Sequence, residues 1–117
     1  MTIFPSAART TAQTSEDFYN TERARGMRVT INVTALTAGA SLTFTINARP
    51  GLSGATVALL ASAAVTATGV TTLVIYPTIT AVSNSIAQTA LPDAWNMTTT
   101  VADTKSVTWS AEFSPLY

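Results

Sequence analysis

Apolar and polar side chains alternate along much of the chain from residue 27 onward. Between residues 29 and 34, and again between residues 42 and 47, valine, isoleucine, leucine or phenylalanine alternates with threonine or asparagine. Such alternation sends one kind of side chain to each face of an extended chain and is typical of half-buried β-strands. Residues 35–40, which include Gly39, are predicted to connect these two strands.

Four more strands are predicted at residues 56–61, 72–76, 95–101 and 106–113. Residues 49–54 form a turn by composition, residues 78–94 are expected to be a long crossing loop with a strand in it, and residues 102–105 are a candidate tight hairpin. All five prolines and all five glycines lie between the predicted strands. The spacing predicts an all-β fold, an antiparallel β-sandwich or jelly roll of six to eight short strands.

Residues 1–26 lack this alternation. They contain Pro5 and the polar run 10–15, so we predict an extended N-terminal arm (1–26) followed by a β-sandwich domain (27–117). A short helix from Ser15 is a local alternative, because Glu16 and Asp17 would lie in its first turn.

Composition sharpens the contrast between these two parts. Hydrophobic residues make up 47% of the chain and charged residues 10%, against roughly 25% charged in an ordinary soluble domain. Seven of the twelve charges lie within the first 28 residues, and six basic residues balance six acidic ones. The chain therefore has no net field to attract nucleic acid or an anionic membrane. Its body has a nearly uncharged surface of the kind found at the centre of protein interfaces.

The residues needed for common catalytic sites are missing or scattered. The chain has no cysteine and no histidine, which removes thiolate chemistry and the commonest general base and metal ligand. Glu16 and Asp17 are adjacent in the arm, where nothing holds them at a fixed separation, and Lys105 beside Ser106 lies in a wet turn rather than a desolvated dyad. We predict that the chain is not an enzyme and carries no metal or cofactor.

The strongest local feature is a basic cluster where the arm meets the first alternating strand. Arg23, Arg25 and Arg28 follow the aromatic residues Phe18 and Tyr19. Phosphate binding, docking onto a partner or onto the chain's own body through ion pairs, and simple solvation are the three interpretations. Trp95 and Trp109 are predicted core residues, with a partner interface as the alternative. The stretch 57–70 is too interrupted by polar residues to span a membrane as a helix.

Four segments resemble a family of small virion proteins of tailed bacteriophages that are encoded among head genes. They are Ile31-Asn32-Val33-Thr34-Ala35-Leu36-Thr37, Leu59-Leu60-Ala61-Ser62-Ala63-Ala64-Val65-Thr66-Ala67-Thr68-Gly69, Val74-Ile75-Tyr76-Pro77 and Leu91-Pro92-Asp93-Ala94-Trp95. The likeness runs from about Arg28 to Ser110. The chain departs from the family pattern in a less charged turn at residues 48–51, and in Asn96 where an arginine usually follows the tryptophan.

The resemblance implies a capsid decoration, or cement, protein on the outer surface of the head, made in the host cytoplasm. The implied partners are the major capsid protein and further copies of the chain, a trimer being the expectation at the level of the family, with no nucleic acid and no membrane. Phe18, Tyr19, Arg23, Arg25 and Arg28 are then the candidate contacts with capsid or neighbouring subunit. The alternative is a tail or fibre β-domain that binds a host glycan or receptor through an aromatic-lined site, for which Tyr19, Tyr76 and Trp95 are the candidates.

Overall fold

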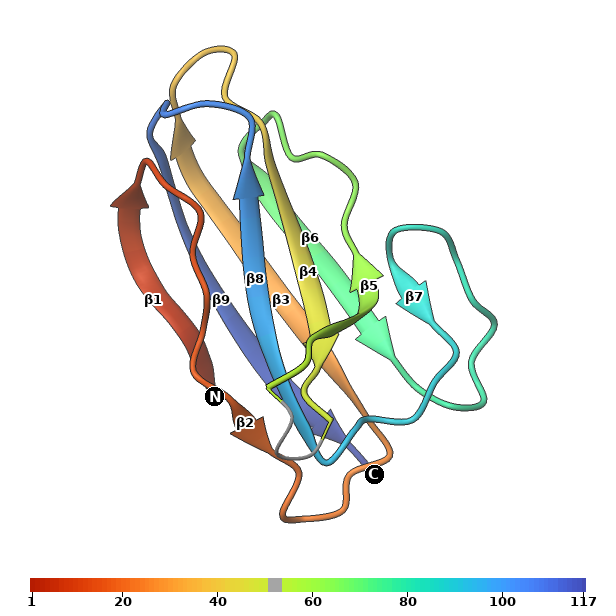
Figure 1. The fold of residues 1–117 in the computed structure, drawn as a ribbon. Coiled ribbons are helices and arrows are strands. Elements are labelled where there is room, and N and C mark those ends of the chain that lie inside the picture. Colours follow the sequence, from red (N-terminus) through yellow and green to blue (C-terminus); the bar gives the residue numbers. More distant parts are fainter. Residues whose placement is uncertain (51–53) are drawn as a thin grey trace.

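Two β-sheets pack face to face in a computed structural model that describes residues 1–50 and 54–117 (Figure 1). The described residues form no helix, and hence none long and apolar enough to cross a membrane. Their strands are β1 (Thr2–Arg9), β2 (Phe18–Tyr19), β3 (Gly26–Leu36), β4 (Leu42–Ala48), β5 (Val57–Ala61), β6 (Gly69–Ile75), β7 (Ile86–Ala87), β8 (Ala94–Val101) and β9 (Val107–Leu116). The predicted all-β sandwich is confirmed.

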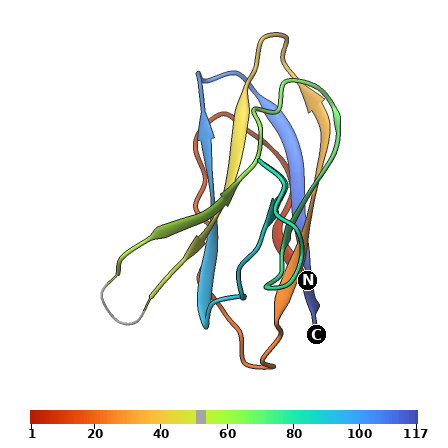
Figure 2. The same cartoon turned by 90° about the vertical axis from the view of Figure 1, so that its right-hand side faces the viewer.

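One sheet has five strands in the order β1-β9-β3-β6-β7, and the other has four in the order β2-β8-β4-β5. All neighbouring strands are antiparallel except β6 and β7. Viewed edge-on, the two sheets stand side by side, and the hairpin of β4 and β5 leans away from the five-stranded sheet (Figure 2). Strand β7 lies inside the predicted crossing loop, as expected.

The alternating pattern places the core between the sheets. In β3, Met27, Val29, Ile31 and Val33 are buried while the residues between them are exposed. The largest fully buried side chains are Trp95 and Trp109, which confirms the core interpretation of both tryptophans. Burying a large apolar side chain contributes roughly 1.5–3 kcal/mol, so this two-sided core accounts for a sandwich without disulfides.

The connection at residues 102–105 differs from its prediction. It joins β8 of the four-stranded sheet to β9 of the five-stranded sheet, so it crosses between the layers and is not a hairpin. The turn chemistry holds, since the Asp103 carboxylate accepts a 2.8 Å hydrogen bond from the Lys105 backbone N–H. Two alternating strands joined by a short turn give the same sequence pattern in a hairpin and in an arch, which is why the pattern misled.

The N-terminal segment is not a separate arm. Strand β1 pairs with β9, Ile3 and Phe4 are buried in the core, and β2 pairs with β8. Register shifts between Thr2 and Phe4 and between Phe4 and Ala7 interrupt the alternation of β1, which hid the strand from a periodicity argument. The boundary at residue 26 therefore does not separate two structural units.

Two smaller expectations are also wrong. Instead of starting a helix, Ser15 donates its backbone N–H to the Met97 carbonyl oxygen at 2.8 Å. Pro5 and Pro115 lie within β1 and β9, and Gly26 and Gly69 open β3 and β6, so proline and glycine do not all fall between strands. Pro5 is tolerated because β1 is an edge strand. The predicted turn at residues 49–54 lies partly outside the described residues.

Candidate interaction surface

The outer side of the five-stranded sheet is poor in charge. We call outer face the side chains of β3, β6 and β9 that point away from the core. They are Arg28, Thr30, Asn32, Thr34, Val70, Thr72, Val74, Thr108, Ser110, Glu112 and Ser114. Directly paired residues share a face of a sheet, so Thr30 lies between Thr72 and Glu112.

Only Arg28 and Glu112 are charged among the side chains of the outer face. Threonine, serine and asparagine dominate the remainder, and Val70 stands 66% exposed among them. Short polar side chains lose little conformational freedom when they are covered. The outer face can therefore be desolvated at lower cost than an ordinary surface rich in lysine and glutamate.

The loop that carries Arg23 and Arg25 is held firmly at one end of the sandwich. The Asn20 side chain closes it, donating to the Ala24 carbonyl oxygen and accepting from the Ala24 N–H, both at 2.9 Å. The Arg25 backbone donates to the Leu116 carbonyl oxygen at 2.9 Å. Arg23 has a φ of 55°, in the left-handed region. These contacts fix the backbone and leave both guanidinium groups at the surface.

Arg23, Arg25 and Arg28 are all exposed, and none of the three forms an ion pair with the described part of the chain. The N-terminal segment is instead tied down by Asp17, whose carboxylate lies 3.2 Å from the Arg49 guanidinium. Asp17 precedes β2 and Arg49 follows β4, so this ion pair spans the intervening strand β8. Docking of the three arginines onto the chain's own body through ion pairs is therefore not observed in the described residues.

Phe18 and Tyr19 have different environments although they are adjacent. The Phe18 ring stacks on Trp95 at 4.8 Å between centroids and meets Phe113 edge-on at 5.3 Å. Tyr19 is 69% exposed. Neighbouring residues of a strand point to opposite faces, which explains why one ring joins the core cluster and the other faces solvent.

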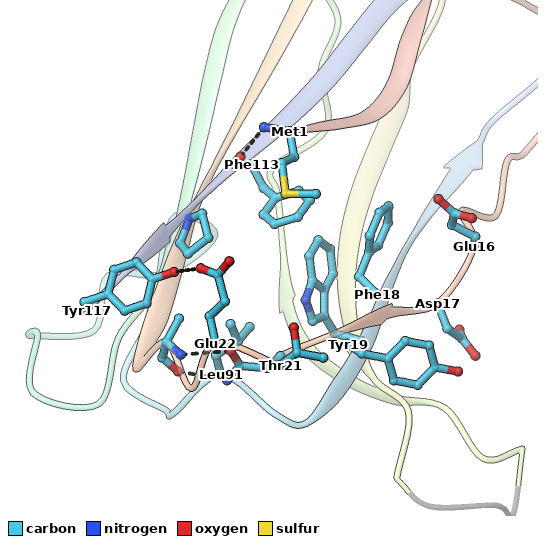
Figure 3. A pocket seen from close by; sticks show the side chains of 14 residues that line it. Met1, Glu16, Asp17, Phe18, Tyr19, Thr21, Glu22, Leu91, Phe113 and Tyr117 are labelled. Atoms are coloured by element: carbon cyan, nitrogen blue, oxygen red, sulfur yellow. Dashed lines mark hydrogen bonds between the residues drawn. The ribbon is translucent and has the colours of Figure 1, made fainter.

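A cavity of about 350 Å³ opens at this same end, between β2 and the ends of β8 and β9 (Figure 3). Phe18, Trp95 and Phe113 contribute aromatic surface to its lining, and Met1 and Leu91 contribute aliphatic surface. In Figure 3, Glu22 and Tyr117 lie on one side of the hollow and Glu16 and Asp17 on the other. The cavity thus has an apolar floor and an acidic rim.

The rim is partly organised by hydrogen bonding. The Tyr117 hydroxyl donates to the Glu22 carboxylate, and this bond raises the pKa of Tyr117 above its ordinary value. The Met1 α-ammonium group donates to the Phe113 carbonyl oxygen at 2.8 Å. No sequence signal pointed to this rim, because Glu22 and Tyr117 meet only through the pairing of β9 with β3.

The aromatic site expected for a glycan or receptor is not assembled from its three candidates. Trp95 is 1% exposed, and the Tyr76 ring lies beside Gly26 and does not line the cavity. Tyr19 alone combines exposure with a place at the cavity. Across residues 1–50 and 54–117, no group of three or more acidic side chains is arranged to hold a metal ion. Comparisons with family models, curated proteins and solved structures return no match.

Proposed function

We propose that this chain is a structural virion protein, a bacteriophage capsid decoration protein that binds the outside of the major capsid protein lattice and stabilises the head. The proposal combines the family resemblance of residues 28–110 with the nature of the surface. It also implies a homo-oligomer, since neighbouring copies on a lattice can brace one another and tolerate modest affinity at each contact.

The observation that carries the proposal is the outer face, which presents eleven side chains with two charges. Interface centres are depleted in charge in the same way. Arg28 belongs to this face, Arg23 and Arg25 lie in the loop before β3, and arginine is enriched at binding hot spots. A face with few charges and with arginines on it and near its end suits a protein that functions in an assembly.

Titration of the purified protein onto undecorated capsids of the bacteriophage that encodes it tests the proposal. We expect saturable binding and a higher thermal transition of the shell. Absence of saturable binding, or binding that leaves the shell's transition unchanged, contradicts a decoration role.

A pair of matched variants tests the predicted contact residues. Arg28→Ser removes a charge from the outer face and should weaken capsid binding roughly tenfold, the scale of an interface arginine. Lys105→Ser is the control, because Lys105 lies in the turn after β8, where its exposed 3.5 Å pair with Asp103 contributes little. Equal binding by both variants would exclude Arg28 as a contact.

A second candidate function is a tail or fibre β-domain that binds a host glycan or receptor. It is favoured by one observation, the exposed Tyr19 beside an aromatic cavity. This function predicts that the protein alone binds host cells in the absence of capsid, and that Tyr19→Ala abolishes this binding. Imaging of intact particles separates the two, since one places the chain on the head and the other on the tail.

A further inference from the structure

The cavity at the β2 end is lined by both aromatic and acidic side chains, a combination that neither the core nor the outer face explains. We propose that it binds a cationic side chain of a partner protein, with arginine preferred over lysine. This inference goes beyond the proposed function, because it concerns the chemistry of one site and holds for any partner that presents such a side chain.

The apolar part of the cavity suits the aliphatic stem and flat head of an arginine. Phe18, Trp95 and Phe113 form a mutually packed aromatic cluster, with Trp95 and Phe113 edge-on at 4.9 Å. Phe18 is half-buried, so part of its ring faces the cavity. Guanidinium groups stack on aromatic rings, and cation–π contacts strengthen when water is excluded.

The charges around the cavity favour a cation. Its charged side chains are Glu16, Asp17 and Glu22, three carboxylates against one cationic group in the lining, the Met1 α-ammonium, which donates to the Phe113 carbonyl oxygen at 2.8 Å. Asp17 is paired with Arg49, which leaves Glu16 and Glu22 without a cationic side chain among the described residues. Glu22 accepts a hydrogen bond from the Tyr117 hydroxyl, and this bond orients the carboxylate.

The aromatic part of this arrangement has a parallel elsewhere in the chain, without the carboxylates. The Arg9 guanidinium lies 4.3 Å from the Trp109 ring and 5.4 Å from the Phe4 ring, and it donates to the Trp109 carbonyl oxygen at 2.8 Å. There the chain's own arginine covers an aromatic pair at the edge of the core. At the β2 end an aromatic cluster also reaches the surface, but no cationic side chain of the described residues covers it.

Arginine is preferred because the carboxylates stand apart. Glu22 and Glu16 lie on different sides of the hollow, and a guanidinium carries five N–H donors in a fixed plane whereas an ammonium is a compact point charge. A volume of about 350 Å³ accepts one such side chain with its stem. A purely aliphatic occupant would leave the acidic rim unmatched.

Short peptides with one central residue flanked by glycine and serine test the proposal with the full-length protein. The central residue is arginine, lysine, norleucine or citrulline, the last of these an uncharged analogue of arginine with the same shape. We expect the arginine peptide to bind best, the citrulline peptide at least roughly fivefold more weakly, and all charge-dependent binding to weaken with added salt. In NMR spectra, the indole signal of Trp95 should move while that of Trp109 stays in place.

Charge-neutralising variants provide the second arm. Glu22→Gln and Glu16→Gln should each weaken binding of the arginine peptide by roughly fivefold and leave the norleucine peptide unaffected. Glu112→Gln is the matched control, since it removes the same charge from the outer face, away from the cavity lining. Unfolding curves of all three variants show whether any loss of binding reflects a loss of fold.

These peptide experiments test the cavity by itself, because none of them uses capsids. Equal binding of arginine and citrulline peptides, an unmoved Trp95 signal, or equal losses in Glu22→Gln and Glu112→Gln would overturn the proposal. A preference for a simple sugar over every peptide would assign the cavity to a glycan instead. A protein that binds arginine peptides yet fails to bind capsids would retain this site and lose the decoration role.

Discussion

Two buried serines, Ser15 and Ser62, have the same role in the four-stranded sheet. Ser15 lies beside β8, and Ser62 lies beside β4. Ser15 donates its backbone N–H to the Met97 carbonyl oxygen, and its hydroxyl accepts the Met97 N–H at 2.8 Å. Ser62 makes the same pair of bonds with Phe44, its hydroxyl accepting the Phe44 N–H at 3.0 Å. Each hydroxyl thus takes the place of a backbone carbonyl in the ladder.

Substituting either serine by alanine should destabilise the fold. Ser15→Ala leaves the Met97 N–H without its acceptor, and Ser62→Ala does the same to the Phe44 N–H, in a part of the sheet where water does not replace it. The expected loss in the free energy of unfolding is about 1–3 kcal/mol for each variant. Urea denaturation followed by tryptophan fluorescence measures this loss.

Ser114→Ala is the control for both variants, because Ser114 is exposed on the outer face. Ser15→Thr keeps a hydroxyl at the same position and should retain most of the stability. If the two buried alanine variants unfold at the same urea concentration as Ser114→Ala, then the hydroxyls do not replace the carbonyl as the geometry indicates.

Strands β3, β4, β5, β6, β8 and β9 could be predicted from the sequence, because alternation or a short apolar run between turn residues marks each of them. Strands β1 and β2 could not. β1 has register shifts on both sides of Phe4, and β2 has two residues, so neither gives a sustained period. Tyr19 and Arg23 could be found from the sequence because each belongs to a local group of similar residues. The acidic rim could not, because Glu22 and Tyr117 come together only in the folded chain.

Strand β1 should be essential for the fold although it lies at a sheet edge. Phe4 is 8% exposed and meets Trp109 edge-on at 4.9 Å. Phe4→Ala should therefore lower the free energy of unfolding by about 3 kcal/mol, the usual scale for an excised core ring. Thr2→Ala, at an exposed position of the same strand, should change it by less than about 0.5 kcal/mol.

Removing residues 1–25 distinguishes an integral strand from a detachable arm. The truncated chain loses β1 and β2, and with them the pairing partners of one side of β9 and β8. We expect it to lack a cooperative thermal transition, as followed by circular dichroism. A truncated protein that melts cooperatively near the full-length temperature would restore the arm hypothesis.

Most charged side chains of the molecule lie away from the outer face. Charged side chains gather around the β2 end, where Glu16, Asp17 and Glu22 line the cavity and Arg49 and Asp93 line the neighbouring hollow beside Tyr19. The outer face beyond this end is almost neutral. This distribution gives the molecule two chemically different surfaces. In our proposals the cavity recognises a charged group and the outer face packs against the capsid.

The outer face of the five-stranded sheet, rather than the outside of the four-stranded sheet, should be the side covered in the assembly. It is the broader sheet and it carries the exposed Val70, whereas on the other sheet Asn47 and Asn96 are already buried and hydrogen-bonded to each other at 3.1 Å. Thr72→Lys should abolish saturable capsid binding, because a strongly hydrated ammonium would enter a packed interface. Thr100→Lys adds the same charge to an exposed position of β8 and should bind like the wild type; the reverse ranking would assign the covered side to the four-stranded sheet.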